Sequence, residues 1–171
     1  MSLFLGCDPG LAGAFAVLRV AEDGHQTIHV TPTPVLWTRI GGGRRRRYDL
    51  HALHRLLGQL PPVTFAYLEA QSARPQQGRS SILTTGYGEG LWTAFLVASA
   101  IPFAVVDPRR WRKQVGLTET TDKVARKAAV RVAACHRFPA VPLKLDHADA
   151  VMLAVAAAIE HGLIARELTY A

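Results

Sequence analysis

The sequence predicts an α/β fold in which helices cover both faces of a five-stranded mixed sheet. Short unbroken apolar runs at residues 3–7 and 63–68 are typical of strands buried on both faces. Asp23-Gly24, between two further apolar segments, is a β-hairpin signal. Later strands alternate with helical patterns, which favours helical crossovers between parallel strands.

The first part of the chain is expected to form three antiparallel strands, a loop and a helix. The strands are predicted at residues 3–7, 12–20 and 26–31. Residues 31–47 contain two prolines, three consecutive glycines and four consecutive arginines, so they are expected to be a loop. Asp49 can cap a helix that runs to about residue 60.

The second part of the chain is expected to form two more strands and four helices. The strands are expected at residues 63–68 and 102–106, and the helices at about residues 80–100, 109–114, 121–136 and 146–161, the last with Gly162 as its C-cap. The order is therefore β-β-β-α-β-α-β, followed by helices. Neither a repeat nor a linker is visible, so residues 1–171 are expected to form one domain.

Composition favours a globular protein with a polyanionic partner. The 171 residues are 49% hydrophobic, and 20 Lys and Arg outnumber 13 Asp and Glu, which gives a net charge of +7. Such a balance is typical of nucleic-acid-binding proteins. No apolar run is long enough to span a membrane, and the N-terminus lacks the pattern of a signal peptide, so a cytoplasmic protein is expected.

Four carboxylates stand where predicted strands end or the last predicted helix begins: Asp8, Glu69, Asp146 and Asp149. Two like charges about 4 Å apart repel by roughly 4 kcal/mol at an effective dielectric constant of about 20. If the four acids meet, a divalent cation must compensate them, and oxygen ligands select Mg²⁺ or Mn²⁺. Spacing alone leaves a second interpretation open, in which each acid serves separately as a turn residue, helix cap or ion-pair partner.

Three segments together resemble the motifs of the RuvC family of Holliday-junction resolvases, within the ribonuclease H-like superfamily. They are residues 5–10 (Leu-Gly-Cys-Asp-Pro-Gly), 66–69 (Ala-Tyr-Leu-Glu) and 146–150 (Asp-His-Ala-Asp-Ala). The motifs occur in the family's order, and the resemblance covers roughly residues 2–160. Residues 106–124 look closest to the phage-encoded branch.

The resemblance implies a dimeric crossover junction endodeoxyribonuclease of DNA recombination and repair, which hydrolyses paired phosphodiesters across a four-way junction. It implies that Asp8, Glu69, Asp146 and Asp149 are the catalytic acids. They would bind two Mg²⁺ ions per site, with Mn²⁺ able to substitute. It also places the helix at about residues 80–100 at the homodimer interface, where Gly86 and Gly90 would allow close helix approach.

One departure from the family pattern leaves the substrate open. Cellular members carry an aromatic residue shortly after the second acid, whereas Ala70, Gln71 and Ser72 follow Glu69 here. Relaxed cleavage of forks, flaps and three-way junctions is therefore an alternative to strict junction resolution. Two further alternatives are a ribonuclease H-type nuclease for RNA–DNA hybrids and a non-catalytic protein that binds branched DNA. The presence of all four acids argues against the second of these.

Basic residues near the motifs are candidates for DNA binding. Arg74 and Arg79 belong to the loop after Glu69, and four more lie on the two helices after residue 108: Arg112, Lys113, Lys123 and Lys127. By resemblance, Arg112 or Lys113, together with Lys123, takes the place of the family's junction-contacting residues. Trp111 is expected to be a packing anchor, and His147 to point away from the acids.

The run of four arginines at residues 44–47 has two interpretations. It is either an additional DNA-binding arm or a solvated, disordered surface loop, because charge runs are often merely solvated.

Overall fold

The computed structural model of the protein describes residues 1–73 and 77–166. Its main sheet has the strand order β3-β2-β1-β6-β7. The strands are β1 (Ser2–Cys7), β2 (Ala14–Val20), β3 (Gln26–Pro32), β6 (Phe65–Glu69) and β7 (Phe103–Val106). β1, β2 and β3 pair antiparallel, whereas β1, β6 and β7 pair parallel. The predicted five-stranded mixed sheet is confirmed.

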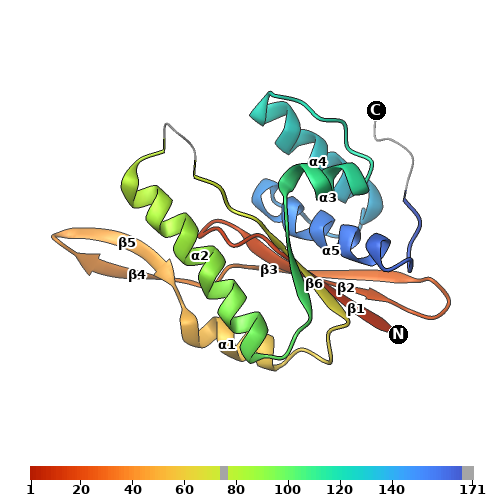
Figure 1. Ribbon diagram of the computed structural model, residues 1–171, viewed down its shortest axis with the longest axis horizontal. Coiled ribbons are helices and arrows are strands. Elements are labelled where there is room, and N and C mark those ends of the chain that lie inside the picture. Colours follow the sequence, from red (N-terminus) through yellow and green to blue (C-terminus); the bar gives the residue numbers. More distant parts are fainter. Residues whose placement is uncertain (74–76, 167–171) are drawn as a thin grey trace.

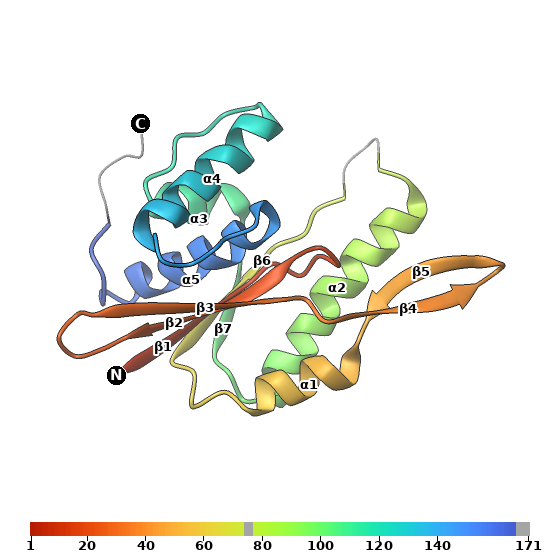
Figure 2. The ribbon, with the colours of Figure 1, turned by 180° about the vertical axis from the view of Figure 1, so that it is seen from behind.

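Helices cover both faces of this sheet, as Figures 1 and 2 show. On one face lie α3 (Pro108–Gln114), α4 (Lys123–Arg137) and α5 (Ala148–Glu160). On the other lie α1 (Leu50–Gly58) and α2 (Arg79–Ala98). Each layer has its own apolar core, because alternate β1 residues face opposite ways: Phe4 packs in the α5 core, and Leu5 in the α2 core. The predicted α/β class is confirmed.

Helix α5 lies directly against β1 at Gly6. A Cβ atom at Gly6 would stand 2.1 Å from the carbonyl oxygen of Ala150 and 2.4 Å from the amide nitrogen of Ala154. Glycine is therefore required at this contact. Every residue from Ala150 to Ala158 is buried, and most are alanine or valine, which suits this close approach. The contact brings the start of α5 to the end of β1.

The predicted loop at residues 31–47 is wrong. These residues form an antiparallel hairpin of β4 (Val35–Ile40) and β5 (Gly43–Tyr48), a separate two-stranded sheet that extends away from the body of the molecule (Figures 1 and 2). Gly41 and Gly42 both have positive φ, at 56° and 81°, as a tight hairpin turn requires. The prolines lie before β4, so they do not interrupt its pairing with β5.

The start of the last helix also differs from the prediction. Residues Leu145–His147 form a 3₁₀ turn, and the α-helix begins at Ala148 rather than at Asp146. Asp146 and Asp149 therefore do not share one face of an α-helix. Gly162 follows the end of α5 with φ of 69°, in line with the predicted C-terminal stop.

Within the described ranges, no helix combines the length and the apolar character that crossing a membrane requires.

Candidate active site

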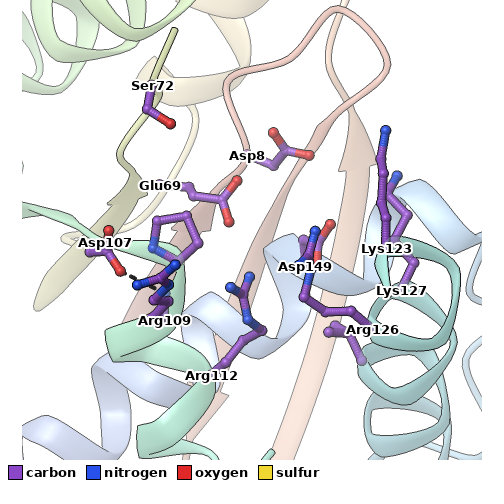
Figure 3. A pocket seen from close by; sticks show the side chains of 12 residues that line it. Asp8, Glu69, Ser72, Asp107, Arg109, Arg112, Lys123, Arg126, Lys127 and Asp149 are labelled. Carbon is purple, nitrogen blue, oxygen red and sulfur yellow. Dashed lines mark hydrogen bonds between the residues drawn. The ribbon is translucent and has the colours of Figure 1, made fainter. Parts of the chain in front are cut away.

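A cavity of about 430 Å³ lies where β1 and β6 end, beside the first turns of α3, α4 and α5 (Figure 3). Three carboxylates proposed from the sequence, those of Asp8, Glu69 and Asp149, line it. Its walls also carry basic side chains from α3 and α4: Arg109, Arg112, Lys123, Arg126 and Lys127. The cavity thus contains both acidic and basic side chains, and we call the five basic residues its basic rim.

The pairing of β1 with β6 places the first two carboxylates together. Cys7 is the register partner of Leu68 in the parallel pair, so Asp8 and Glu69 follow at the same edge of the sheet. Asp149 reaches this edge because α5 packs on Gly6. Asp8 is held by its turn: the amide of Gly10 donates to Asp8 Oδ1 at 3.1 Å. A Cβ at Gly13 would stand 2.4 Å from the Asp8 carbonyl oxygen, so the loop closes tightly around Asp8.

Burial and mutual repulsion raise the pKa values of these acids. Burial, with the nearby charge of Asp149, raises the pKa of Asp8 to about 6. Burial, with the charges of Asp8 and Asp149, raises the pKa of Glu69 to about 8. Burial also raises the pKa of Asp149, although Lys127 and Arg112 oppose that shift. The basic rim therefore does not compensate the carboxylates fully.

The donor set fits a hard divalent cation, because all three side chains offer carboxylate oxygens and their repulsion would be relieved by binding. Across the described part of the chain, however, no three Asp, Glu, His or Cys side chains stand close enough to form a metal site as they are. Asp8, Glu69 and Asp149 are the residues that would hold the ion if their side chains moved together.

The structure does not bring Asp146 into the cavity. Its Oδ1 accepts a hydrogen bond from Lys127 Nζ at 2.7 Å, and its side chain is 51% exposed. Exposed ion pairs of this kind contribute about 0–1 kcal/mol, so the pair is easily broken. His147, between the two acids of the third motif, is not one of the cavity residues. Three of the four predicted acids are thus together, and the fourth neutralises a lysine at the rim.

The predicted basic residues are divided between several places. Arg112, Lys123 and Lys127 line the cavity, whereas Lys113 does not. Arg79 is the first residue of α2 and is outside the cavity lining. Arg74 lies outside the described residues.

Two further basic residues line the cavity but are not in the predicted DNA-binding set, Arg109 and Arg126. Helical spacing is the signal that could have added them. Arg109 stands three residues before Arg112 on α3, and Arg126 three residues after Lys123 on α4. Residues three apart share a helix face, so each helix presents two or more cations on one side.

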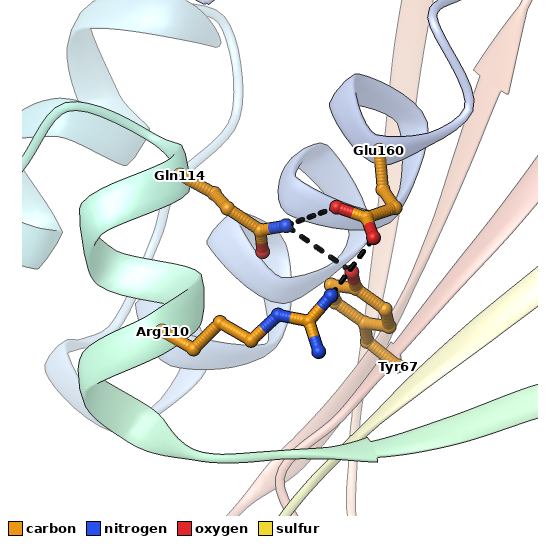
Figure 4. A network of polar contacts seen from close by, with 4 residues as sticks. All are labelled: Tyr67, Arg110, Gln114 and Glu160. Atoms are coloured by element: carbon orange, nitrogen blue, oxygen red, sulfur yellow. Dashed lines mark hydrogen bonds and ion pairs between the residues drawn. The ribbon is translucent and has the colours of Figure 1, made fainter.

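Trp111 is buried, as expected, but it is more than a packing anchor. Its indole Nε1–H donates to Glu69 Oε1 at 3.0 Å, and this hydrogen bond lowers the pKa of Glu69 against the stronger effect of burial. The helix that carries Trp111 is fixed by a polar network (Figure 4). In it Arg110 pairs with Glu160 of α5 at 2.8 Å, and Gln114 donates to both Glu160 and Tyr67. α3 is thus tied to α5 and β6 around Glu69.

Replacing Trp111 with phenylalanine is expected to raise the pKa of Glu69 in the metal-free protein. Loss of the indole donor removes a hydrogen bond to the charged form of Glu69, so the pKa of Glu69 rises further and more of it is protonated at neutral pH. A hydrogen bond to a charged group contributes about 1.5–3 kcal/mol, which corresponds to a shift of roughly one to two pH units. NMR titration of the Glu69 side-chain carboxyl carbon in metal-free protein measures this shift.

The matched control is Trp92→Phe, since Trp92 is also fully buried but packs in the opposite core. It tests whether loss of indole packing alone raises the pKa of Glu69. An unchanged Glu69 pKa in Trp111→Phe, or an equal rise in Trp92→Phe, would contradict the role given to Trp111.

Comparison with solved structures defines the fold class. The chain has a RuvC-like, ribonuclease H-like α/β fold. It is similar to two structures of RuvC from Thermus thermophilus, each with a TM-score of 0.60 over 94% of this chain. One is bound to a Holliday junction substrate (12% identity, 96% of that chain covered), and the other is described as the RuvC structure (14% identity, 97% covered).

At these identities the likeness shows the fold alone. No protein-family model matches the chain, and no curated protein matches it. The resemblance to the phage-encoded branch at residues 106–124 stays a prediction.

Proposed function

We propose that the protein is a metal-dependent endonuclease that cleaves branched DNA and resolves Holliday junctions by paired nicks. The observation that carries the proposal is the cavity itself. Partly buried carboxylates, directly after β1, at the end of β6 and in the first turn of α5, face the same space as arginines and lysines from α3 and α4 (Figure 3). Incompletely compensated acids beside phosphate-binding cations are what phosphodiester hydrolysis with divalent ions requires. The RuvC-like fold supports the same class of reaction.

Each part of the cavity has a role in this proposal. Asp8, Glu69 and Asp149 would hold Mg²⁺ or Mn²⁺, and Asp146 would join them after leaving its exposed pair with Lys127. Bound Mg²⁺ would supply Lewis acidity to the scissile phosphate and a water of lowered pKa. Arg109, Lys123 and Arg126 would bind the phosphates on either side and hold the strand over the carboxylates. Trp111 orients Glu69.

Paired nicks require two active sites, and we propose that α2 forms the homodimer interface. α2 exposes large apolar side chains, with Leu83 76% and Tyr87 52% accessible. A Cβ at Gly86 or Gly90 would meet nothing within 4 Å, so this strip is open to a second helix. Gly88 has a different purpose, because it makes room for the Tyr48 hydroxyl and the Pro9 carbonyl.

A cleavage panel tests the proposed substrate. With Mg²⁺, a four-way junction is expected to be nicked in pairs, forks and flaps more slowly, and linear duplex least. The panel also contains an RNA–DNA hybrid, and the nicks are mapped on each strand. Preferential cutting of the hybrid would support a ribonuclease H-type activity instead. Metal-independent binding of junctions without any nicking would support a non-catalytic DNA-binding protein.

A further inference from the structure

The β4–β5 hairpin concentrates the positive charge of the molecule. Residues 35–48 contain five arginines and no acidic residue: Arg39, Arg44, Arg45, Arg46 and Arg47. All five are exposed, and none forms an ion pair with an acid in the described part of the chain. Neutralising the five would lower the formal net charge from +7 to +2. Uncompensated cations at this density repel one another, so the hairpin favours an anionic partner.

Strand register sorts these side chains onto two faces. Trp37 is the partner of Arg46, and Arg39 is the partner of Arg44, so these four residues share one face of the ribbon. Arg44 lies over the Trp37 ring, its guanidinium carbon 5.2 Å from the ring centroid. This cation–π contact orients a guanidinium on a surface where Trp37 is itself 57% exposed.

The base of the hairpin is fastened to the loop that holds Asp8. The hydroxyl of Tyr48, the last residue of β5, donates to the Pro9 carbonyl at 2.7 Å. Just before β4, the amide of Thr33 donates to the Gly13 carbonyl at 3.0 Å. Both ends of the hairpin are thus tied to the turn that follows Asp8. A ligand seated on the hairpin is therefore positioned relative to the carboxylates.

The hairpin and the cavity rim lie on opposite sides of the main sheet. Figures 1 and 2 show β4 and β5 on the side of α1 and α2, with α3 and α4 on the other side. A second cavity, of about 470 Å³, lies between Arg45, Arg46 and Arg47 and the first half of α2. Basic side chains are therefore present in both layers of the fold, which suits a polyanion that extends from the active-site cavity to the hairpin.

We propose that the β4–β5 hairpin is a second DNA-binding surface, which contacts the sugar–phosphate backbone of duplex DNA outside the active-site cavity. The inference rests on the proposed function for the identity of the polyanion. Arginine is suited to this contact because its planar guanidinium binds phosphate oxygens in pairs. A two-stranded ribbon is also narrow enough to lie along a duplex groove. Arg44 and Arg46, on the face of Trp37, are the central contacts.

The test compares two double variants that remove the same charge, in buffer with EDTA so that only binding is measured. Arg44→Gln with Arg46→Gln alters the hairpin. Arg19→Gln with Arg55→Gln alters exposed arginines of β2 and α1. Affinity for a labelled duplex is measured against salt concentration. Loss of two phosphate contacts is expected to lower the slope of log affinity against log salt by about 2, and to weaken binding by about tenfold to a hundredfold near 0.1 M salt.

Two further measurements keep the outcome clear. Arg44→Lys with Arg46→Lys retains the charge and is expected to restore most of the affinity, which separates lost contacts from misfolding. Light scattering on each variant detects any change in oligomeric state. Equal slopes for the hairpin and control pairs would overturn the proposal, as would competition by polyglutamate as effective as competition by DNA.

The same preparations separate this inference from the proposed function. If wild-type protein nicks junctions with Mg²⁺ while the hairpin variant binds duplex like the control variant, the inference fails and the nuclease stands. If the hairpin variant loses duplex binding but wild-type protein nicks nothing, the DNA-binding hairpin stands and the nuclease fails.

Discussion

Replacing Asp8 with asparagine is expected to abolish Mg²⁺-dependent cleavage of a four-way junction while junction binding is retained. Asparagine keeps the shape of the side chain but removes a charge from the centre of the carboxylate cluster. Metal ions contribute several kcal/mol of transition-state stabilisation, so the expected loss is about 10³-fold or more. Binding is expected to persist, because the proposed phosphate contacts come from α3, α4 and the β4–β5 hairpin, and removal of a negative charge reduces repulsion. Single-turnover cleavage and gel-shift binding measure the two effects.

Asp107→Asn is the matched control, because Asp107 is another aspartate of the same cavity. Its side chain caps α3 by accepting from the Arg109 amide at 2.7 Å, a contact that asparagine preserves. Cleavage by this variant is expected to stay near the wild-type rate. Asp146→Asn is expected to lose cleavage as Asp8→Asn does. If Asp8→Asn cleaves at the rate of the Asp107→Asn control, the catalytic role proposed for Asp8 is contradicted.

The metal-free protein is expected to lose stability as the pH rises from about 5 to about 8. Unfolded aspartate and glutamate titrate near pH 4. In the folded protein the pKa of Asp8 is about 6 and that of Glu69 about 8. Between these values the folded state binds more protons than the unfolded state, so the free energy of unfolding falls with rising pH. The loss is on the order of a few kcal/mol, and it is complete above the folded pKa of Glu69.

Glu69→Gln is expected to remove most of this pH dependence and to raise the melting temperature of the metal-free protein at pH 8. One kcal/mol corresponds to about 2–4 °C for a chain of this size, so a rise of several degrees is expected. Mg²⁺ is expected to raise the melting temperature of wild-type protein at pH 8 more than that of Glu69→Gln. Thermal unfolding followed by circular dichroism across pH measures all of these.

Glu22→Gln provides the control, because the Glu22 side chain is 94% exposed and lies near the other end of the sheet. Its substitution is expected to leave the pH profile of stability unchanged. Wild-type protein that becomes more stable between pH 5 and pH 8 in the absence of metal would contradict the burial of incompletely compensated carboxylates.

The parts of the fold that hold Asp8, Glu69 and Asp149 could be predicted from the sequence because local patterns encode them. An apolar run that ends at an acid identifies a central strand, and two such parallel strands bring Asp8 and Glu69 to one edge. The helix that carries Asp149 is also predicted, at about residues 146–161. Its contact with Gly6, which sets how near Asp149 comes, depends on three-dimensional packing.

Three features could not be predicted because they depend on contacts between distant residues or on the competition between two local structures. Because the arginines of β5 do not alternate with apolar residues, the sequence pattern does not predict a strand there or its pairing with β4. The hydrogen bond from Trp111 to Glu69 joins residues 42 positions apart. The orientation of Asp146 follows from a 3₁₀ turn and from Lys127, neither of which the motif specifies.

The most direct test of the metal-binding carboxylate cluster is anomalous X-ray diffraction from crystals of the protein soaked in Mn²⁺. Anomalous peaks among the carboxylates of Asp8, Glu69 and Asp149 in wild-type crystals, and their loss in Asp8→Asn crystals, are the predicted result. Density for Mn²⁺ only elsewhere on the molecule, or equal peaks in both proteins, would contradict it.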